Sequence, residues 1–150
     1  MSMNTSLTTV LDLVRARTVV ARQVDHSLGS FHGLGLNDLA LLLELRGAPE
    51  GRLRRVELAE RLGITTSGVA RQLVPLEKIG LVDREPSPGD ARLALVVLTV
   101  SGARVADEAL PTAEHAAERA LELLWTADQS AQLGDLLRNA SSNARPNVRG

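Results

Sequence analysis

The segment from Glu57 to Thr99 constrains the fold of this chain more than any other part of the sequence. Ala59, Gly63 and Val69 stand at positions i, i+4 and i+10, and two helices joined by a tight turn at a steep angle need these residue types there. Alanine lets the helices approach, glycine accepts the sharp turn, and valine anchors the second helix in the shared core. Two apolar segments separated by a Pro/Gly turn follow, and they predict a two-stranded wing.

Hydrophobic periodicity predicts helices before this segment. Apolar residues recur near a 3.6-residue period over residues 8–28, with Gly29 as the expected stop and a glycine-broken loop over residues 31–35. Asn37 is the expected N-cap of a leucine-rich helix that Gly47 closes. Because that helix is apolar on nearly every side, we expect it to be deeply buried.

The two helices of the central motif are expected over residues 55–62 and 65–79. Pro75 lies inside the second, where a proline costs about 3 kcal/mol in an isolated helix. Leu76 and Ile79 continue the apolar spacing beyond it, and burial of such side chains contributes a similar amount. We therefore predict helix on both sides of Pro75.

The C-terminal half is predicted to hold two strands and two helices. They are the strands 81–84 and 93–98 and the helices 100–124 and 127–140. Residues 85–90 are expected to form a turn without strand potential. Thr99 can cap the first helix, and Pro111 must kink or split it because proline removes a hydrogen bond. Thr126 and Gln129 form a capping box for the last helix.

These elements predict a mainly α fold with a small β-wing, a winged helix-turn-helix with flanking dimerisation helices. We expect one domain over residues 1–150, with the winged helix at 36–99, dimerisation helices at 8–28 and 100–140, and a disordered tail at 141–150. The outer helices carry apolar stripes that the winged helix is too small to cover. An intertwined homodimer would bury them, and folding back on the same chain is the alternative.

Composition excludes several classes of protein. Without cysteine the chain has no disulfide, thiolate metal site or thiol redox sensor. No apolar run is long enough to span a membrane and no leader is recognisable, so we expect a cytoplasmic protein without a membrane partner. The net charge is −1, yet residues 46–92 carry nine basic and seven acidic side chains. A small positive excess in that region agrees weakly with a nucleic-acid partner.

Three motifs in matching order and spacing resemble the MarR (multiple-antibiotic-resistance) family of regulators. Residues 57–63 are similar to the first helix and turn of its DNA-binding motif, residues 76–82 to the end of its recognition helix, and residues 90–99 to its wing signature. The resemblance implies a homodimeric, ligand-responsive repressor on a pseudo-palindromic operator in double-stranded DNA. It also implies a small aromatic or phenolic effector. The chain departs from the family pattern at Arg54 and Arg55, where a Ser or Thr cap is usual.

The second helix of the motif supplies the residues expected to read DNA. Its small N-terminal residues let the backbone approach the duplex, and its N-terminus favours phosphate. Arg71 and Gln72 are long enough to reach base edges. On the wing, Arg92 is expected to enter the minor groove, with Asp90 anchoring an arginine. The full set of predicted DNA-binding residues is Thr65, Thr66, Ser67, Gly68, Arg71, Gln72, Arg84, Asp90, Arg92, Arg54 and Arg55.

An effector site is expected at the end of the first helix and along the helix that follows the wing. The candidates are His26, Phe31, His32, Arg104 and Trp125, although a capping histidine and core aromatics are the favoured explanation of these residues. We find no catalytic arrangement, no cofactor motif and no metal site, since three scattered histidines lack ligand spacing. The alternative function is a winged-helix protein-interaction module without specific DNA binding, which would need neither Asp90 nor Arg92.

Overall fold

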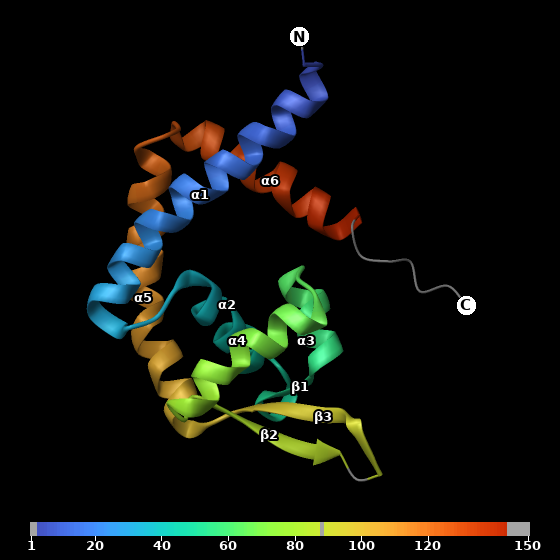
Figure 1. The fold of residues 1–150 in the computed structure, drawn as a ribbon. Coiled ribbons are helices and arrows are strands. Elements are labelled where there is room, and N and C mark those ends of the chain that lie inside the picture. Colours follow the sequence, from blue (N-terminus) through green and yellow to red (C-terminus); the bar gives the residue numbers. More distant parts are fainter. Residues whose placement is uncertain (1–2, 88, 144–150) are drawn as a thin grey trace.

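The fold is mainly helical with one small sheet, as the sequence predicts (Figure 1). The computed structural model describes residues 3–87 and 89–143, and of residues 87, 90–93 and 143 it describes the backbone alone. The elements are α1 (Thr5–His32), α2 (Leu36–Arg46), a short 3-10 turn (Pro49–Gly51), β1 (Arg52–Arg54), α3 (Arg55–Leu62), α4 (Thr66–Lys78), β2 (Val82–Ser87), β3 (Asp90–Leu98), α5 (Val100–Glu122) and α6 (Ala127–Asn143).

We call residues 36–99 the head and the helices α1, α5 and α6 the outer helices. Helix α2 is the centre of the head, as its leucine content predicts. The side chains that fill this core are 0–1% exposed, and they are Leu39, Leu41, Leu42, Leu45, Leu58, Val69 and Leu73. This core fixes α3 and α4 against α2, so that one side of α4 is left for other contacts.

The turn between α3 and α4 forms as predicted. Gly63 ends α3 in the left-handed conformation with φ +66°, and the Ile64 amide donates to the Ala59 carbonyl at 3.1 Å. Ala59 is 4% exposed and Val69 is fully buried. The helix-turn-helix of the sequence analysis is therefore present, with each of its three marker residues in the expected role.

Pro75 lies inside one continuous helix, which confirms the prediction of helix on both sides. The Ile79 amide donates to the Pro75 carbonyl at 3.2 Å, and the Leu81 amide donates to the Leu76 carbonyl at 3.0 Å. Leu76 is 2% exposed, whereas Ile79 is 61% exposed. The expected apolar contribution of Ile79 was wrong, because this residue is the C-cap and has left the buried side of the helix.

The sheet has the order β1-β3-β2, and both pairs are antiparallel. The sequence analysis missed β1, which is only three residues long. It was also wrong to treat residues 85–90 as free of strand, because β2 runs to Ser87 and β3 begins at Asp90. Pro86 is tolerated because β2 is an edge strand, and the register shifts between Glu85 and Ser87.

Helix α1 is longer than predicted at both ends. It passes through Gly29 and ends at Gly33, which has φ +66°, so the expected stop at Gly29 and the loop from residue 31 were wrong. Val24 and Leu28, both at most 2% exposed, hold this part of α1 in the core. Their packing outweighs the roughly 1 kcal/mol that a glycine costs inside a helix.

The N-cap of helix α2 is Gly35 and not the predicted Asn37. The Gly35 amide donates to Asp38 Oδ2 at 3.0 Å, and the Leu36 amide donates to Asp25 Oδ1 of α1 at 2.7 Å. Two carboxylates therefore satisfy the first amides of the helix, and Asn37 stays exposed. Gly47 ends the helix as expected.

Helix α5 packs beside α1 along much of its length (Figure 1). Its buried residues are small, and they are Gly102, Ala106, Ala109, Ala113, Ala116 and Ala120. Small side chains let the two helices approach closely. Pro111 does not split α5, which runs unbroken from the Thr99 cap, whose Oγ1 accepts from the Gly102 amide at 2.9 Å.

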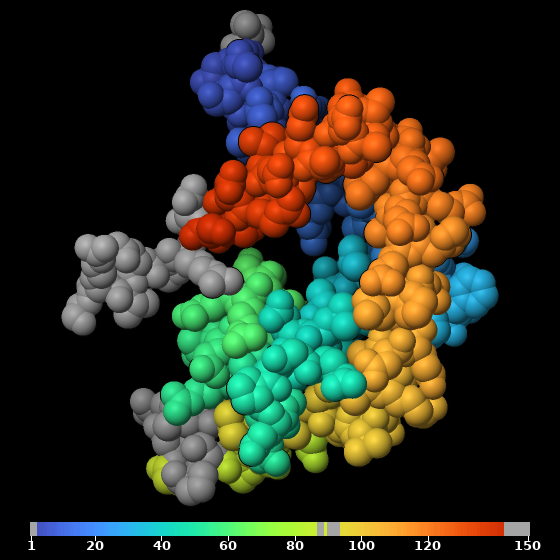
Figure 2. Space-filling model, turned by 180° about the vertical axis from the view of Figure 1, so that it is seen from behind, coloured from blue at the N-terminus to red at the C-terminus, as the bar shows by residue number. Residues whose placement is uncertain are grey.

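Helix α6 begins at the predicted capping box, in which Thr126 N donates to Gln129 Oε1 at 3.0 Å and Gln129 N donates to Thr126 Oγ1 at 3.3 Å. It continues to Asn143, so residues 141–143 are helical and not part of a disordered tail. The rest of the predicted tail lies outside the described residues. In Figure 2 an open space separates α6 from the head. Within the described ranges no helix is long and apolar enough to cross a membrane.

Candidate nucleic-acid interface

The N-terminal half of α4 is an exposed surface built on a buried opposite side. Val69, Leu73 and Leu76 are at most 2% exposed and attach α4 to the head. Thr65, Thr66, Ser67 and Arg71 are all exposed; this list contains four of the residues predicted to contact DNA. The helix is thus anchored on one side and presents small polar residues and one arginine on the other.

The cap of α4 forms at Thr65, the first of the two predicted candidates. Its Oγ1 accepts from the Gly68 amide at 3.0 Å and lies 3.2 Å from Ser67 Oγ. A Cβ on Gly68 would lie only 3.1 Å from Thr65 Oγ1. Glycine therefore allows the hydroxyl to sit over the helix end, and the Thr65 side chain is committed to capping.

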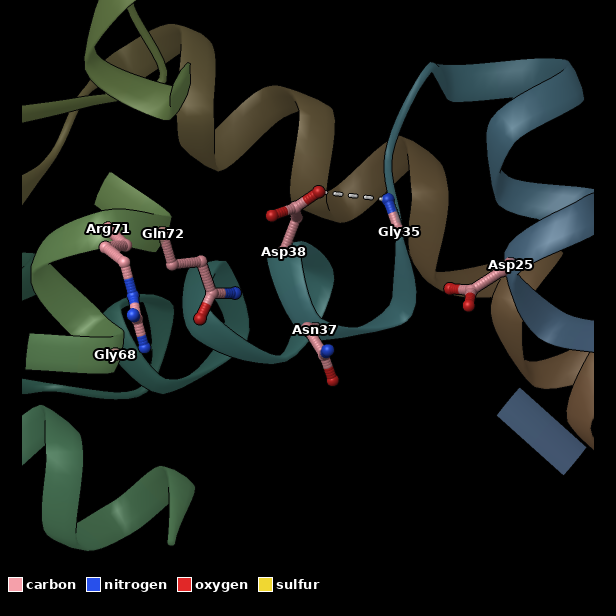
Figure 3. Close-up of a pocket in the computed structure, with 7 residues that line it drawn as sticks. All are labelled: Asp25, Gly35, Asn37, Asp38, Gly68, Arg71 and Gln72. Atoms are coloured by element: carbon pink, nitrogen blue, oxygen red, sulfur yellow. Dashed lines mark hydrogen bonds between the residues drawn. The ribbon is translucent and has the colours of Figure 1, made fainter. Parts of the chain in front are cut away.

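The side chains of Arg71 and Gln72 point in different directions, although the two residues are adjacent in α4. Arg71 is exposed, as a base-reading residue would be. The Gln72 side chain instead turns toward α2, where its Nε2 is buried without a hydrogen-bond partner (Figure 3). In this arrangement Arg71 is available to a duplex, whereas the predicted base contact of Gln72 would require its side chain to turn outward.

The predicted phosphate contacts at Arg54, Arg55 and Arg84 lie in different surroundings. Arg54 is exposed at the end of β1, and its amide donates to Glu57 Oε2 at 2.9 Å, which is the half of a capping box that needs no Ser or Thr side chain. Arg55 is half-buried. Arg84 forms an ion pair with Glu77 of α4, a partner that the sequence analysis missed because the pairing depends on how the wing meets the helix.

The wing residues Asp90 and Arg92 belong to β3, and Asp90 pairs with Ser87 across the wing. Their side chains lie outside the described part of the chain. Their predicted contacts with DNA therefore stay predictions. Gly89, before β3, has φ +98°, a conformation that favours glycine.

The five predicted effector residues do not form one pocket within a chain. Phe31 is 77% exposed, and His32 Nε2 lies 2.9 Å from Thr112 Oγ1 of α5. Arg104 faces Glu108 on the same helix at 3.5 Å, and His26 is exposed. Arg104 and Trp125 lie near opposite ends of α5, roughly 30 Å apart at 1.5 Å per residue.

An open cleft of about 500 Å³ lies elsewhere, between α1, the first turn of α2, and α4. Its lining residues are Asp25, Gly35, Asn37, Asp38, Gly68, Arg71 and Gln72. Figure 3 shows Asp25 on one side of the cleft and the α4 residues on the other. Sequence reasoning missed this grouping, because three separate elements contribute and no motif spans them.

Arg46 of α2 and Asp107 of α5 form an ion pair away from α4. Asp107 accepts from Arg46 Nε at 3.2 Å and from Nη2 at 3.1 Å, and this hydrogen-bonded carboxylate raises the pKa of Arg46. The pair is exposed and joins α2 to α5. Among the side chains that the structure describes, no cluster of three histidine or acidic residues is arranged to hold a metal ion.

Comparison with known proteins agrees with this geometry. Residues 32–93 match the MarR family. An uncharacterised helix-turn-helix transcriptional regulator of Mycobacterium leprae is 33% identical over 108 residues, which cover 72% of this chain and 71% of that protein.

Solved structures extend the similarity over almost the whole chain. Sco3205 from Streptomyces coelicolor, a MarR family transcriptional regulator crystallised with DNA, is 28% identical with a TM-score of 0.81, covering 98% of this chain and 92% of that one. BpsR from Bordetella bronchiseptica, whose DNA binding is regulated by 6-hydroxynicotinic acid, shares the fold at 21% identity and a TM-score of 0.78, with 94% and 98% coverage.

Proposed function

This chain belongs to the MarR family and is a DNA-binding transcriptional regulator, and from that premise we propose that it acts as a homodimeric repressor on a pseudo-palindromic operator. The observation that carries the proposal is the exposed N-terminal half of α4, capped by Thr65 and held by three buried side chains. In a two-fold dimer, two such helices enter successive major grooves. Repression follows when the dimer occupies a promoter.

The contacts proposed for DNA divide into two kinds. Arg71, with Thr66 and Ser67, reads base edges and positions the helix, and Arg92 with Asp90 serves the wing. Arg54 and Arg55 contact phosphates beside α3. Thr65 and Gly68 shape the helix end and permit close approach of the backbone, and Gln72 contributes only if its amide turns away from the cleft.

Binding-site selection from random duplexes tests this proposal. The expected product is an inverted repeat whose half-sites are about 10 base pairs apart, or a multiple of that spacing. Affinity for the selected duplex and for a scrambled duplex is then measured at two salt concentrations. A wild-type protein that prefers neither duplex at either salt would favour the protein-interaction module instead.

We also propose that a small aromatic acid regulates the protein through the cleft beside α4. The support is its position, because Gln72 and Arg71 of the recognition helix line the same hollow as Asp25 of α1. A ligand that favours one arrangement of these helices would change the spacing of the two heads. The Gln72 Nε2 is buried without a hydrogen-bond partner, so a ligand that draws this side chain into the cleft would supply an acceptor.

Thermal-shift measurements with 6-hydroxynicotinic acid and with benzoate test the effector proposal. Gln72→Leu should remove a stabilising shift, while Phe31→Ala should leave it unchanged. The reverse result would place the site at the end of α1, among the residues first suggested by the sequence. Absence of any shift with either compound would count against aromatic acids as effectors.

A further inference from the structure

Two consecutive residues of β2, Arg84 and Glu85, carry opposite charges, and each forms an ion pair near the base of the wing. Arg84 and Glu85 point to opposite faces, as neighbours on a strand must. Arg84 forms an ion pair with Glu77 of α4, and Glu85 forms one with Arg52 of β1. The two interactions together tie β2 to the recognition helix on one face and to the far edge of the sheet on the other.

The strand register explains why these pairs form. Arg84 lies opposite Val96, which in turn lies opposite Leu53, and both apolar residues are at most 5% exposed. Arg84 therefore belongs to the inner face, where α4 packs. Glu85 lies opposite Leu95 on the outer face, and its partner Arg52 reaches it from β1, on the other side of β3.

The Glu77–Arg84 pair spans the turn between α4 and β2. Backbone hydrogen bonds already hold that turn, since the Gly80 amide donates to the Glu77 carbonyl at 3.0 Å. Leu81 and Val82 are also buried, so the ion pair acts on the part of β2 beyond them, where the wing leaves the core. The Glu77 and Arg84 side chains are 29% and 43% exposed, so solvent screens the attraction but the guanidinium does not point freely outward.

We propose that Arg84 is a positioning residue of the DNA-binding surface and that, with Glu77, it fixes the angle between the recognition helix and the wing. Arg84 is then not a phosphate contact, which revises the expectation from the sequence. Because helix and wing must enter neighbouring grooves together, a fixed angle lowers the ordering cost of binding. The inference rests on the proposed wing contact with DNA.

The two roles for Arg84 predict opposite results for Glu77→Gln. If Arg84 positions the wing, loss of the carboxylate weakens binding to the selected duplex by about fivefold, the upper range for an exposed ion pair. The salt dependence of binding should not change. If Arg84 contacts phosphate, loss of the competing carboxylate should strengthen binding instead of weakening it.

Arg84→Gln and a charge exchange complete the experiment. We expect Arg84→Gln to weaken binding as Glu77→Gln does, with an unchanged salt slope. The double variant E77R/R84E should restore most of the affinity, because the pair is re-formed in reverse. A salt slope lowered by about 0.9 in Arg84→Gln, or a double variant weaker than both single variants, would overturn the proposal.

Glu108→Gln is the matched control, because it removes the same charge from an exposed arginine pair on α5. It should bind the selected duplex as wild type does. In an Arg92→Ala background, Glu77→Gln should cause no further loss of affinity for the selected duplex, since both changes act through the wing. A full additional loss would contradict positioning, whereas an Arg92→Ala variant that binds normally would contradict the wing contact in the proposed function.

Discussion

The head and the outer helices differ in how completely they bury their apolar side chains. Every helix of the head has fully or almost fully buried side chains, and its exposed apolar residues, such as Val56 and Val74, are separate from one another in sequence. In α1 the buried residues Val24 and Leu28 lie in its second half. No side chain of residues 127–142 in α6 is buried.

The exposed apolar side chains of the outer helices are numerous and closely spaced. In α1, in α6 and just after α5 they include Leu7, Val10, Leu13, Val14, Val19, Leu123, Leu124, Leu136 and Leu137, each 44–70% exposed. Patches of this kind mark interaction surfaces in soluble proteins. The comparison teaches that the head completes its core within one chain, whereas the outer helices leave apolar surface that the proposed second copy would cover.

The largest expected effect comes from placing a charge in that uncovered surface. Val10→Lys would bury two unpaired ammonium groups in a two-fold dimer and should raise its dissociation constant by about two orders of magnitude. Sedimentation at micromolar concentration measures this. Helix content in the head should persist, because no head residue is changed.

Thr8→Lys is the matched control, since Thr8 is exposed and lies about 200° around α1 from Val10 at 3.6 residues per turn. It should remain dimeric. A wild-type chain that sediments as a stable, folded monomer would break the comparison between the head and the outer helices.

A smaller but clear effect is expected where the head meets α5. A Cβ on Gly102 would lie 2.0 Å from the Leu81 carbonyl oxygen and 2.7 Å from Leu98 Cδ1. Gly102→Ala should therefore destabilise the protein by about 2 kcal/mol through overpacking, and should also alter the preferred spacing of half-sites, because α5 must shift against the head. Thermal unfolding and site selection measure the two effects.

Gly134→Ala provides the same chemical change in α6. Its Cβ would meet the flexible Arg138 guanidinium, with Nη1 at 3.2 Å. We expect no loss of stability there, and a gain of up to about 1 kcal/mol from helix propensity. Equal destabilisation by both substitutions would mean that α6 is as closely packed as the junction of head and α5.

Arg71→Ala tests DNA binding by the head without changing the outer helices. Loss of a bidentate base contact should cost about 1–3 kcal/mol on the selected duplex and less on a scrambled one, without affecting dimerisation. Arg104→Ala, an exposed arginine of α5, should leave both affinities unchanged. Equal losses on the two duplexes would assign Arg71 to phosphate contact instead of base reading.

The smallest effect is expected between the outer helices themselves. Thr112→Val removes the hydrogen bond to His32 that joins the end of α1 to α5, and should lower stability by about 1 kcal/mol. Thr9→Val removes a hydroxyl that bonds only within its own helix, to the Thr5 carbonyl. If both variants unfold at the same temperature, the α1–α5 bond adds nothing beyond helix packing.

Local signals predicted the head well. Gly63, the Thr65 cap and the Thr99 cap act within a few residues along the chain, and the structure confirms each. The errors occurred where distant contacts outweigh local preference. Gly29 stays helical because Leu28 is buried, and residues 85–87 form strand because β3 supplies hydrogen-bond partners.

In the candidate site, too, local signals predicted some features and contacts between distant residues decided others. The exposed position of Arg71 follows from helical spacing, because Val69, Leu73 and Leu76 occupy the opposite side. The cleft and the Glu77–Arg84 pair had no counterpart in the sequence analysis. Their residues come from separate elements, and no short-range pattern records how those elements meet.

The sequence by itself determined the order of the helices and of the two wing strands, the turn at Gly63, the burial of α2 and the membership of a recognisable family. These features depend on short-range periodicity, capping and backbone freedom, which act locally. Only the tertiary structure decided that Gln72 lines a cleft and that Arg84 is held by Glu77. Those outcomes depend on the relative placement of packed elements, and side chains far apart in the chain meet only when the core has set that placement.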